Sequence, residues 1–429
     1  MTRNTKASHQ HSASDLHRHC CGGEDGVDPG RRHTLDMLAK GGLAAMMGPL
    51  ASSLAAETAA AAQQDDVLRI GYLPITDATP LLVAHAMGYF ADEGIEVEDP
   101  TLMRGWSPLI EGFAAGRFNL VHFLKPIPVW MRYNNNFPVK IMAWAHTNGS
   151  ALVVGKQHVD VTDFSGLGGK QVAVPFWYSM HNIVLQYALR AAGIKPVIRS
   201  QSEPLADDEC NLQVLPPPEM PPALAAGQID AYIVAEPFNA MGELLAGARM
   251  LRFTGDIWKN HPCCVVCMNE QTVEAKPEWT QGVMNALVRA SIYASQNKAE
   301  VAGMLSRDGN GYLPAPADVV RRAMTLYEGN DAYLESGAIQ NQSEFNNGRI
   351  DFAPWPYPSA TRMIVEAMNE TVVSGDTRFL NGLDPDFVAE DLVNYDFVRT
   401  ALEKFPNWQS DLSVAPGGDP FSREEVLKL

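Results

Sequence analysis

The 429-residue chain lacks any long run of lysine or arginine, and its formal net charge is −17. A surface that binds duplex nucleic acid needs a basic run or stripe, so this composition excludes nucleic acid as a partner. Hydrophobic residues make up 46% and charged residues 19%, as in ordinary folded globular proteins. The length is sufficient for two lobes that each bury their own core.

The chain also lacks an apolar run of membrane-spanning length. The best candidate, residues 41–54, has about 14 residues, whereas a span needs about 20. Arg31 and Arg32 precede this run, and an alanine-rich stretch at 55–62 follows it. This order predicts a twin-arginine export signal that is cleaved between Ala56 and Ala62, and hence a periplasmic protein. An uncleaved signal that keeps the chain at the membrane is the alternative.

Cysteine is scarce, and its six copies are unevenly placed. The N-terminal tail contains Cys20 and Cys21 beside His17 and His19, which are ligand types for copper or zinc. Because this tail precedes the export signal, we expect it to be removed with the signal. We therefore assign it no metal role in the mature chain.

Three more cysteines lie in residues 260–269, NHPCCVVCMN. Cys264 and Cys267 have the spacing of a redox pair, but the valines between them favour a strand. In a strand over 263–268 these two side chains point to opposite faces, and Cys263 lies about 13 Å from Cys267. That separation excludes a disulfide between Cys263 and Cys267. A disulfide from Cys210 to one of the three stays open in an oxidising compartment.

From residue 66 onward, short apolar runs alternate with amphipathic stretches, which indicates an α/β protein. A hinged cleft between two α/β lobes, followed by a helical C-terminal third, suits this order. Residues 146–150 are expected to form a turn, and Ser179 is expected to cap a helix. The expected strands cover 67–72, 95–98, 119–124, 139–145, 151–154, 171–174, 212–215, 229–234, 251–254 and 263–268. The expected helices cover 79–94, 107–115, 179–192, 277–297, 298–306, 316–328, 359–371 and 387–404.

An ordered series of short motifs resembles the nitrate/bicarbonate-binding proteins of ABC importers, within the wider nitrate, sulfonate and taurine group. The series is IGYLPITDATPL at 70–81, Trp106, TNG at 147–149, SMH at 179–181, EPFN at 236–239 and NHP at 260–262. The resemblance implies a type II periplasmic-binding-protein fold. Residues 66–150 plus 263–404 would form lobe one, 151–262 lobe two, and 405–429 a surface extension.

The same resemblance implies a monomeric, non-catalytic protein without a cofactor. It would deliver a small-molecule ligand to an ABC permease and its ATPase subunits at the inner membrane. Two alternatives stay open. One is a soft-metal or thiol-dependent binding or redox protein that uses the cysteines of 263–267, and the other is a periplasmic sensor domain.

The resemblance also implies ligand-binding residues. Trp106 matches a tryptophan that packs against a flat ligand and donates its indole N–H. His181 matches a histidine at a helix N-terminus, where free backbone N–H groups attract a negative group. Two positions depart from the nitrate pattern: Ser150 replaces a glutamine, and Cys264 replaces a lysine. A carboxylate that helps bicarbonate-binding relatives to hold calcium is also missing there.

The loss of that lysine removes a charge-assisted hydrogen bond that is worth about 1.5–3 kcal/mol to a buried anion. The sequence therefore favours a neutral or weakly charged small solute, or one that tolerates a thiol, over nitrate. We expect no metal ligand among the site residues. The remaining candidate ligand-binding residues, on loops that face the expected cleft, are Thr76, Asp77, Asn148, Trp177 and Glu236.

Overall fold

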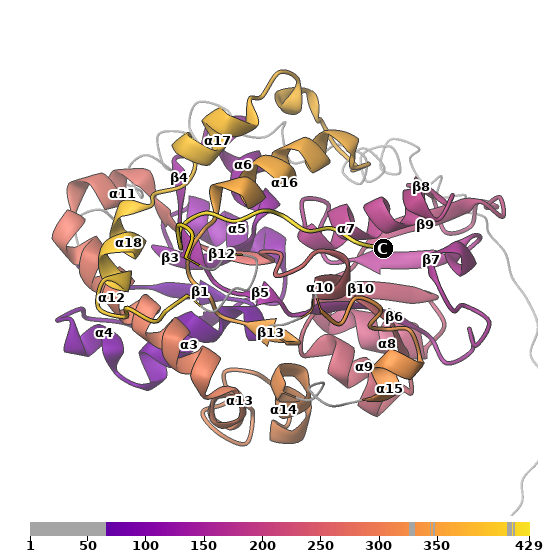
Figure 1. Cartoon of the computed structure of the whole chain (residues 1–429), viewed down its shortest axis with the longest axis horizontal. Coiled ribbons are helices and arrows are strands. Elements are labelled where there is room, and N and C mark those ends of the chain that lie inside the picture. The colour runs from indigo at the N-terminus through magenta and orange to yellow at the C-terminus, as the bar shows by residue number, and fades with distance from the viewer. Residues whose placement is uncertain (1–65, 326–330, 344, 346–347, 410–413, 415–416) are drawn as a thin grey trace, which may run out of the picture. The chain divides into compact units, whose positions relative to one another are not determined.

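The computed structural model describes residues 66–325, 331–343, 345, 348–409, 414 and 417–429. The expected export signal and the His/Cys tail belong to residues 1–65 and lie outside this part of the chain. Among the described residues, no helix combines the length and the apolar character that a membrane span requires. All described residues belong to one compact unit, Leu50–Leu429, which contains two large β-sheets (Figure 1).

The first sheet has the strand order β2-β1-β3-β12-β4. Its strands β1 and β3 are buried on both faces, which explains their continuous apolar sequences. The β1 strand pairs in parallel with β2 and β3, whereas β12 runs antiparallel between β3 and β4. The strands are β1 (Ile70–Tyr72), β2 (Thr101–Leu102), β3 (Leu120–Leu124), β4 (Val139–Trp144) and β12 (Cys264–Asn269).

The second sheet has the strand order β11-β6-β10-β7-β9-β8. Its strand β6 runs antiparallel to both β10 and β11, and the other neighbours are parallel. The strands are β6 (Ser150–Val154), β7 (Gln171–Val174), β8 (Lys195–Val197), β9 (Glu209–Val214), β10 (Ala231–Ala235) and β11 (Arg249–Phe253). A separate two-stranded ladder joins β5 (Thr147–Asn148) to β13 (Ile350–Asp351).

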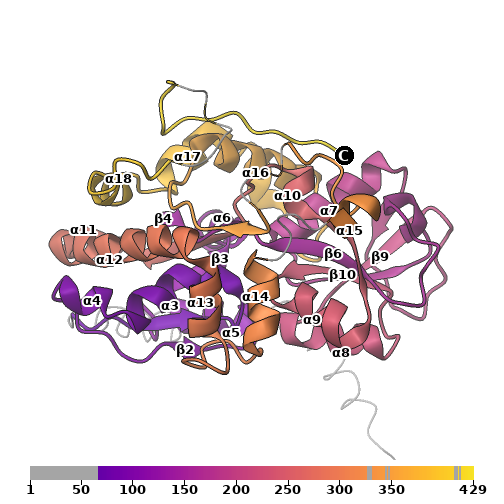
Figure 2. The same cartoon turned by 60° about the horizontal axis from the view of Figure 1, so that its bottom comes forward.

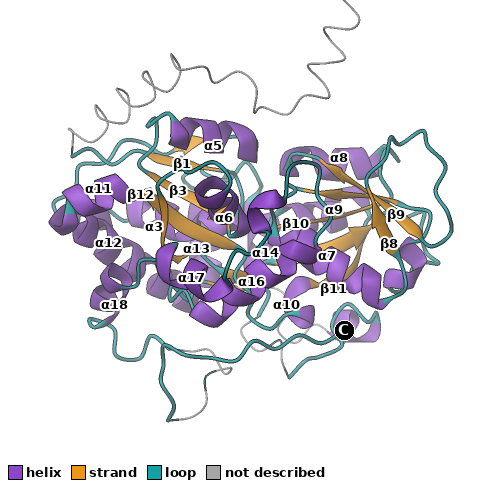
Figure 3. Ribbon diagram, turned by 90° about the horizontal axis from the view of Figure 1, so that it is seen from above, coloured by secondary structure: helices purple, strands orange, loops and turns teal. Residues whose placement is uncertain are grey.

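Helices cover both sheets (Figures 2 and 3). The long helix α12 packs against α3, α4 and α18 beside the first sheet, and α8 and α9 pack beside β10 of the second. The α-helices that precede β12 in the chain are α3 (Thr79–Ala86), α4 (Tyr89–Asp92), α5 (Trp106–Ala114), α6 (Pro126–Tyr133), α7 (Met180–Ala191), α8 (Met220–Ala225), α9 (Phe238–Ala246) and α10 (Thr254–Ile257). The later ones are α11 (Glu270–Ala275), α12 (Pro277–Gln296), α13 (Lys298–Leu305), α14 (Ala317–Thr325), α15 (Asp331–Glu335), α16 (Pro358–Glu370), α17 (Pro385–Asp391) and α18 (Asp396–Leu402).

Several sequence predictions are confirmed, and others are wrong. No strand forms over 95–98, where Val97 makes only an isolated bridge to Leu68. The Ser179 hydroxyl accepts a hydrogen bond from the Asn182 amide (3.1 Å) and caps α7, as expected. The single helix expected over 79–94 is two helices, because Gly88 has a φ of 69° and ends the first one. The helix expected over 387–404 is likewise divided into α17 and α18. The turn expected over 146–150 contains β5, whose partner β13 lies 200 residues further on and gives no local signal.

The chain passes between the two sheets at residues 145–149 and again at 254–263. Backbone hydrogen bonds hold these two connections together, from Ala145 to Cys264 (3.0 Å) and from Asn148 to His261 (3.0 Å). The C-terminal segment packs on the second connection, where the Arg423 guanidinium donates to the Asn260 carbonyl (3.1 Å). Because Arg423 is only 7% exposed, this part of the expected surface extension also contributes buried contacts.

Candidate functional site

A group of buried polar side chains lies where loops from the two sheets meet. We call it the central cluster and define it as Asp77, His122, His146, Ser150, His181, Cys263 and Cys264. The first sheet and its loops provide the two cysteines, His122 on β3, His146 after β4 and Asp77 on the 3₁₀ turn after β1. The second sheet provides Ser150, at the start of β6, and His181, in the first turn of α7.

Asp77, His146 and Cys264 are in direct contact. The distance from Asp77 Oδ2 to His146 Nε2 is 2.7 Å, and the Cys264 thiol donates to the same carboxylate oxygen (3.1 Å). The Cys264 backbone N–H donates to His146 Nε2 (3.2 Å). Burial raises the pKa of Asp77. Burial by itself would lower the pKa of the His146 imidazole, but the neighbouring Asp77 carboxyl outweighs this effect and raises that pKa to about 10.

Ser150, His181 and Cys263 form the other half of the cluster. The Ser150 hydroxyl lies 2.8 Å from His181 Nε2, and the Cys263 sulfur lies 3.8 Å from both. Burial opposes ionisation of the Cys263 thiol, but hydrogen bonding with Cys264 and the neighbouring His181 and His146 together hold its pKa well below the usual value. Burial raises the pKa of Cys264 instead. The two adjacent cysteines thus differ in acidity.

Trp106 reaches the cluster through His122. The two rings meet edge to face with 5.6 Å between their centroids, and the Leu73 amide donates to His122 Nε2 (3.0 Å). Within the described part of the chain, Trp106 Nε1, His181 Nδ1 and Asp77 Oδ1 are buried without a hydrogen-bond partner. A buried polar atom without a partner costs about 1–3 kcal/mol. These atoms are available to a small ligand that carries both donors and acceptors.

His261 and Thr254 stabilise the cluster through the backbone of Ser150. The Thr254 hydroxyl donates to the Ser150 carbonyl (2.9 Å) and lies 2.8 Å from His261 Nε2, which therefore carries a proton. Burial lowers the pKa of His261 to about 4, so its ring is neutral. This chain of contacts fixes the backbone at Ser150.

Sequence reasoning missed three members of the cluster: His122, His146 and Cys263 as a polar contact. His122 could have been found, because a histidine within the apolar strand LVHFL is unusual for a core position. His146 gave no such signal, since it lies in an expected turn and its partners are distant in sequence. Cys263 was assigned to a continuous strand, whereas β12 begins one residue later.

The structure brings together five of the predicted ligand-binding residues: Asp77, Ser150, His181 and Cys264 within the cluster, and Trp106 beside it. Three more lie around it with other partners. The Thr76 hydroxyl donates to the Glu236 carbonyl (3.2 Å), and the Asn148 amide donates to the Gly348 carbonyl (3.1 Å). The Glu236 carboxylate accepts hydrogen bonds from Arg349.

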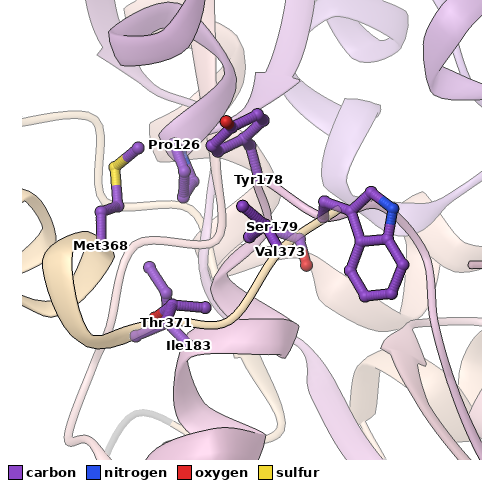
Figure 4. A pocket seen from close by; sticks show the side chains of 8 residues that line it. Pro126, Tyr178, Ser179, Ile183, Met368, Thr371 and Val373 are labelled. Atoms are coloured by element: carbon purple, nitrogen blue, oxygen red, sulfur yellow. The ribbon is translucent and has the colours of Figure 1, made fainter. Parts of the chain in front are cut away.

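Trp177 lines a small pocket at the N-terminus of α7, and none of the residues that line this pocket belongs to the central cluster. Figure 4 shows Tyr178 and Ser179 on one side of the pocket and Met368 on the other. The Tyr178 ring stacks on Trp130 with 5.7 Å between the centroids. The lining residues are Pro126, Trp177, Tyr178, Ser179, Ile183, Met368, Thr371 and Val373.

Comparison with known proteins relates this chain to a family. Nitrate/nitrite binding protein NrtA of Nostoc sp. is 27% identical over 313 residues, which cover 68% of this chain and 67% of the relative. Bicarbonate transport ATP-binding protein CmpC of Synechocystis sp. is 27% identical over 249 residues, 54% of this chain but only 36% of the relative. The chain therefore spans about two thirds of the first relative and about a third of the second.

The crystal structure of the periplasmic nitrate-binding protein NrtA from Synechocystis matches with a TM-score of 0.64 at 19% identity, over 80% of this chain and 89% of that one. This match confirms the periplasmic-binding-protein fold that the sequence motifs implied. A model of the NMT1-like family matches residues 61–306, which is more than half of the chain. The chain therefore belongs to the NMT1-like family.

Proposed function

We propose that this chain is the solute-binding component of an ABC importer and catalyses no reaction. It captures a small solute at the central cluster and delivers it to a membrane permease that an ATPase drives. The similarity to NrtA, a nitrate/nitrite binding protein, supports the binding role. The similarity to part of CmpC, which is named as a transport ATP-binding protein, supports an importer as the setting.

The observation that carries this proposal is a pair of buried nitrogen atoms, one beside each sheet, that have no hydrogen-bond partner among the described residues. Trp106 Nε1 comes from α5 beside the first sheet, and His181 Nδ1 comes from α7 beside the second. A solute that binds both atoms links the two sheets. Ligand binding between α/β lobes with hinge closure works in this way.

The chemistry of the cluster favours a solute that is neutral or carries little negative charge. Cys264 stands where the resemblance places a lysine, and its thiol lies 3.1 Å from the Asp77 carboxylate. A full anion at this position would face a carboxyl group instead of an ammonium group. A small polar molecule related to nitrate or bicarbonate, with its own donor for Asp77 Oδ1, satisfies the cluster better.

The proposed setting is the periplasm, which the chain reaches as a folded monomer by the twin-arginine route. The Arg31-Arg32 pair and the apolar run after it support this route. The folded state fits such export, since this pathway carries folded proteins. Labelling the chain in cells with and without a functional twin-arginine translocase tests this part separately.

A thermal-shift screen of the exported chain tests the binding role. The solutes are nitrate, nitrite, bicarbonate, cyanate, thiocyanate, urea-like amides and sulfonates. A specific ligand raises the melting temperature by mass action, and the shift grows with concentration. His181→Gln should abolish the shift, whereas Tyr187→Phe, on the exposed side of the same helix, should retain it. Absence of any solute-dependent shift, together with thiol-dependent turnover, would contradict the proposal.

A further inference from the structure

We infer that Asp77, His146, Cys263 and Cys264 form a binding site for one divalent cation of the zinc class. One donor atom from each of these four residues lies within 4.8 Å of the other three, and all four side chains are fully buried. This inference goes beyond the proposed function. It holds whether or not the chain delivers a solute to a permease.

The donor set consists of ligand types that zinc accepts. Two thiolates, one imidazole and one carboxylate complete a four-coordinate site, with Zn–S bonds of about 2.3 Å and Zn–N or Zn–O bonds of about 2.0–2.2 Å. Magnesium and calcium require more ligands, mainly oxygens, so this set does not suit them. Sulfur and nitrogen donors select borderline and soft metals such as zinc.

The spacing of the four donor atoms is already near what one zinc ion requires, since all lie within 4.8 Å of one another. Donor atoms bound to one zinc ion lie about 3.3–3.8 Å apart, as the bond lengths imply. The Cys264 sulfur lies 3.1 Å from Asp77 Oδ2, and Asp77 Oδ2 lies 2.7 Å from His146 Nε2. Both distances are shorter than this range, so these side chains would have to move slightly apart to admit a cation. Displacements of less than about 1 Å are sufficient.

The backbone explains how adjacent cysteines reach one site. In a continuous strand, neighbouring side chains point to opposite faces. Cys264 is the first residue of β12, and Cys263 lies just before it. The Lys125 amide donates to the Cys263 carbonyl (2.9 Å), and the Ala145 amide donates to the Cys264 carbonyl (3.0 Å). These bonds hold both residues at the start of an interior strand of the first sheet, and a preorganised site requires such rigid support.

The burial of the site has a consequence for a bound cation. Direct bonds to the carboxylate and the two thiolates would replace the solvation that burial denies to these groups. Since the four ligands are buried, we expect the bound ion to exchange slowly.

Cobalt(II) titration of the full chain, purified without metal under reducing conditions, tests this inference. We expect one equivalent to give thiolate-to-cobalt charge transfer and the visible bands of a tetrahedral ion. Zinc should displace the cobalt at equal stoichiometry. Cys263→Ser and Cys264→Ser should each weaken binding by more than about 100-fold, because the loss of even an outer-shell partner costs 10–100-fold.

Matched controls separate this site from the other thiols. Cys210 and Cys267 are also buried and free, so Cys210→Ser and Cys267→Ser should retain the cobalt spectrum. Cys20→Ser/Cys21→Ser removes the tail thiols and should retain it too. If the tail variant loses the spectrum, or if Cys263→Ser/Cys264→Ser retains it, the inference is overturned.

Folding and transport are checked independently. Circular dichroism of each variant identifies those that fail to fold, and Asp77→Asn then serves as a second ligand variant whose shape is almost unchanged. Weakened cobalt binding by folded Asp77→Asn supports the site, and unchanged binding overturns it. The solute screen repeated with a chelator keeps the two proposals distinct. A chain that binds a solute but no metal contradicts only this inference.

Discussion

Arg349 and Glu236 form an ion pair in which neither side chain is exposed to solvent. The Arg349 Nε donates to Glu236 Oε1 (2.7 Å), and the other carboxylate oxygen accepts from the Ala240 amide (3.0 Å) in the first turn of α9. Glu236 follows β10, and Arg349 precedes β13. The pair therefore ties the second sheet to the C-terminal part of the chain.

Glu236→Gln should strongly destabilise the fold, because it removes the nearest carboxylate from the buried Arg349 guanidinium and leaves only the more distant Glu243 carboxylate (3.7 Å). We expect the free energy of unfolding to fall by about 3–5 kcal/mol, measured by urea denaturation. Asp92→Asn breaks the exposed Asp92–Arg289 pair and should change stability by no more than about 1 kcal/mol. Equal losses of stability in the two variants would show that the buried pair contributes no more to stability than the exposed pair.

A second charged group should make stability sensitive to acid. Arg132 donates to Glu270 (2.9 Å) and to Asp391 (2.7 Å), and Lys140 lies 2.9 Å from Glu270. Hydrogen bonds from Arg132 lower the pKa of both carboxyl groups in the folded state. Their stabilisation is complete above the ordinary values of 4.5 and 3.8 and is lost as the pH falls through the lowered values.

Arg132→Met should therefore lower the free energy of unfolding at neutral pH. It should also reduce the further loss of stability below about pH 4.5. Urea unfolding at several pH values measures both effects. Arg307→Met, at the exposed pair with Asp308, provides the control and should leave the acid dependence as it is. A variant at Arg132 with an unchanged pH profile would contradict this account.

The sequence predicted the parts of this fold that local pattern determines. The apolar run NLVHFL predicted a strand at the position of β3, and Ser179 predicted the start of α7. Both depend on residues within a few positions of each other. The ordered motifs predicted the fold class, which the match to NrtA confirms.

The candidate site was harder to predict because its contacts join distant segments. Trp106 and His181 were singled out through a resemblance, but the contact between Asp77 and His146 spans about 70 residues and leaves no local pattern. Residues 263–268 were expected to form one strand, which separates the two adjacent cysteines. The start of β12 at Cys264 depends on pairing with β3, which sequence periodicity does not report.

Gly149→Ala should disturb the central cluster through His146. Gly149 has a φ of 76°, and an added Cβ would lie 2.9 Å from His146 Nδ1 and 3.0 Å from Ile350 Cδ1. The backbone strain alone costs about 1–2 kcal/mol, and the close contact adds to it. Gly193→Ala is a matched control, with a φ of 77° and no atom within 4 Å of the added Cβ.

We expect Gly149→Ala to lose more stability than Gly193→Ala in urea denaturation, and we expect only Gly149→Ala to weaken cobalt binding. The difference between the two losses of stability measures the contact with His146 and Ile350, since the backbone strain is common to both variants. Equal losses would mean that the neighbouring side chains yield to the added methyl group.

Trp106→Phe should weaken solute binding while retaining the edge-to-face contact with His122. The substitution removes Nε1, a buried donor that has no partner among the described residues, and keeps an aromatic ring. One net hydrogen bond contributes about 0.5–1.5 kcal/mol, so affinity should fall by up to about tenfold in calorimetry with the strongest solute of the screen. Trp279→Phe is the control, because its Nε1 donates to the Asp66 carbonyl at the surface (2.8 Å). Unchanged affinity in Trp106→Phe, with Trp279→Phe also unchanged, would show that the solute does not bind the indole N–H of Trp106.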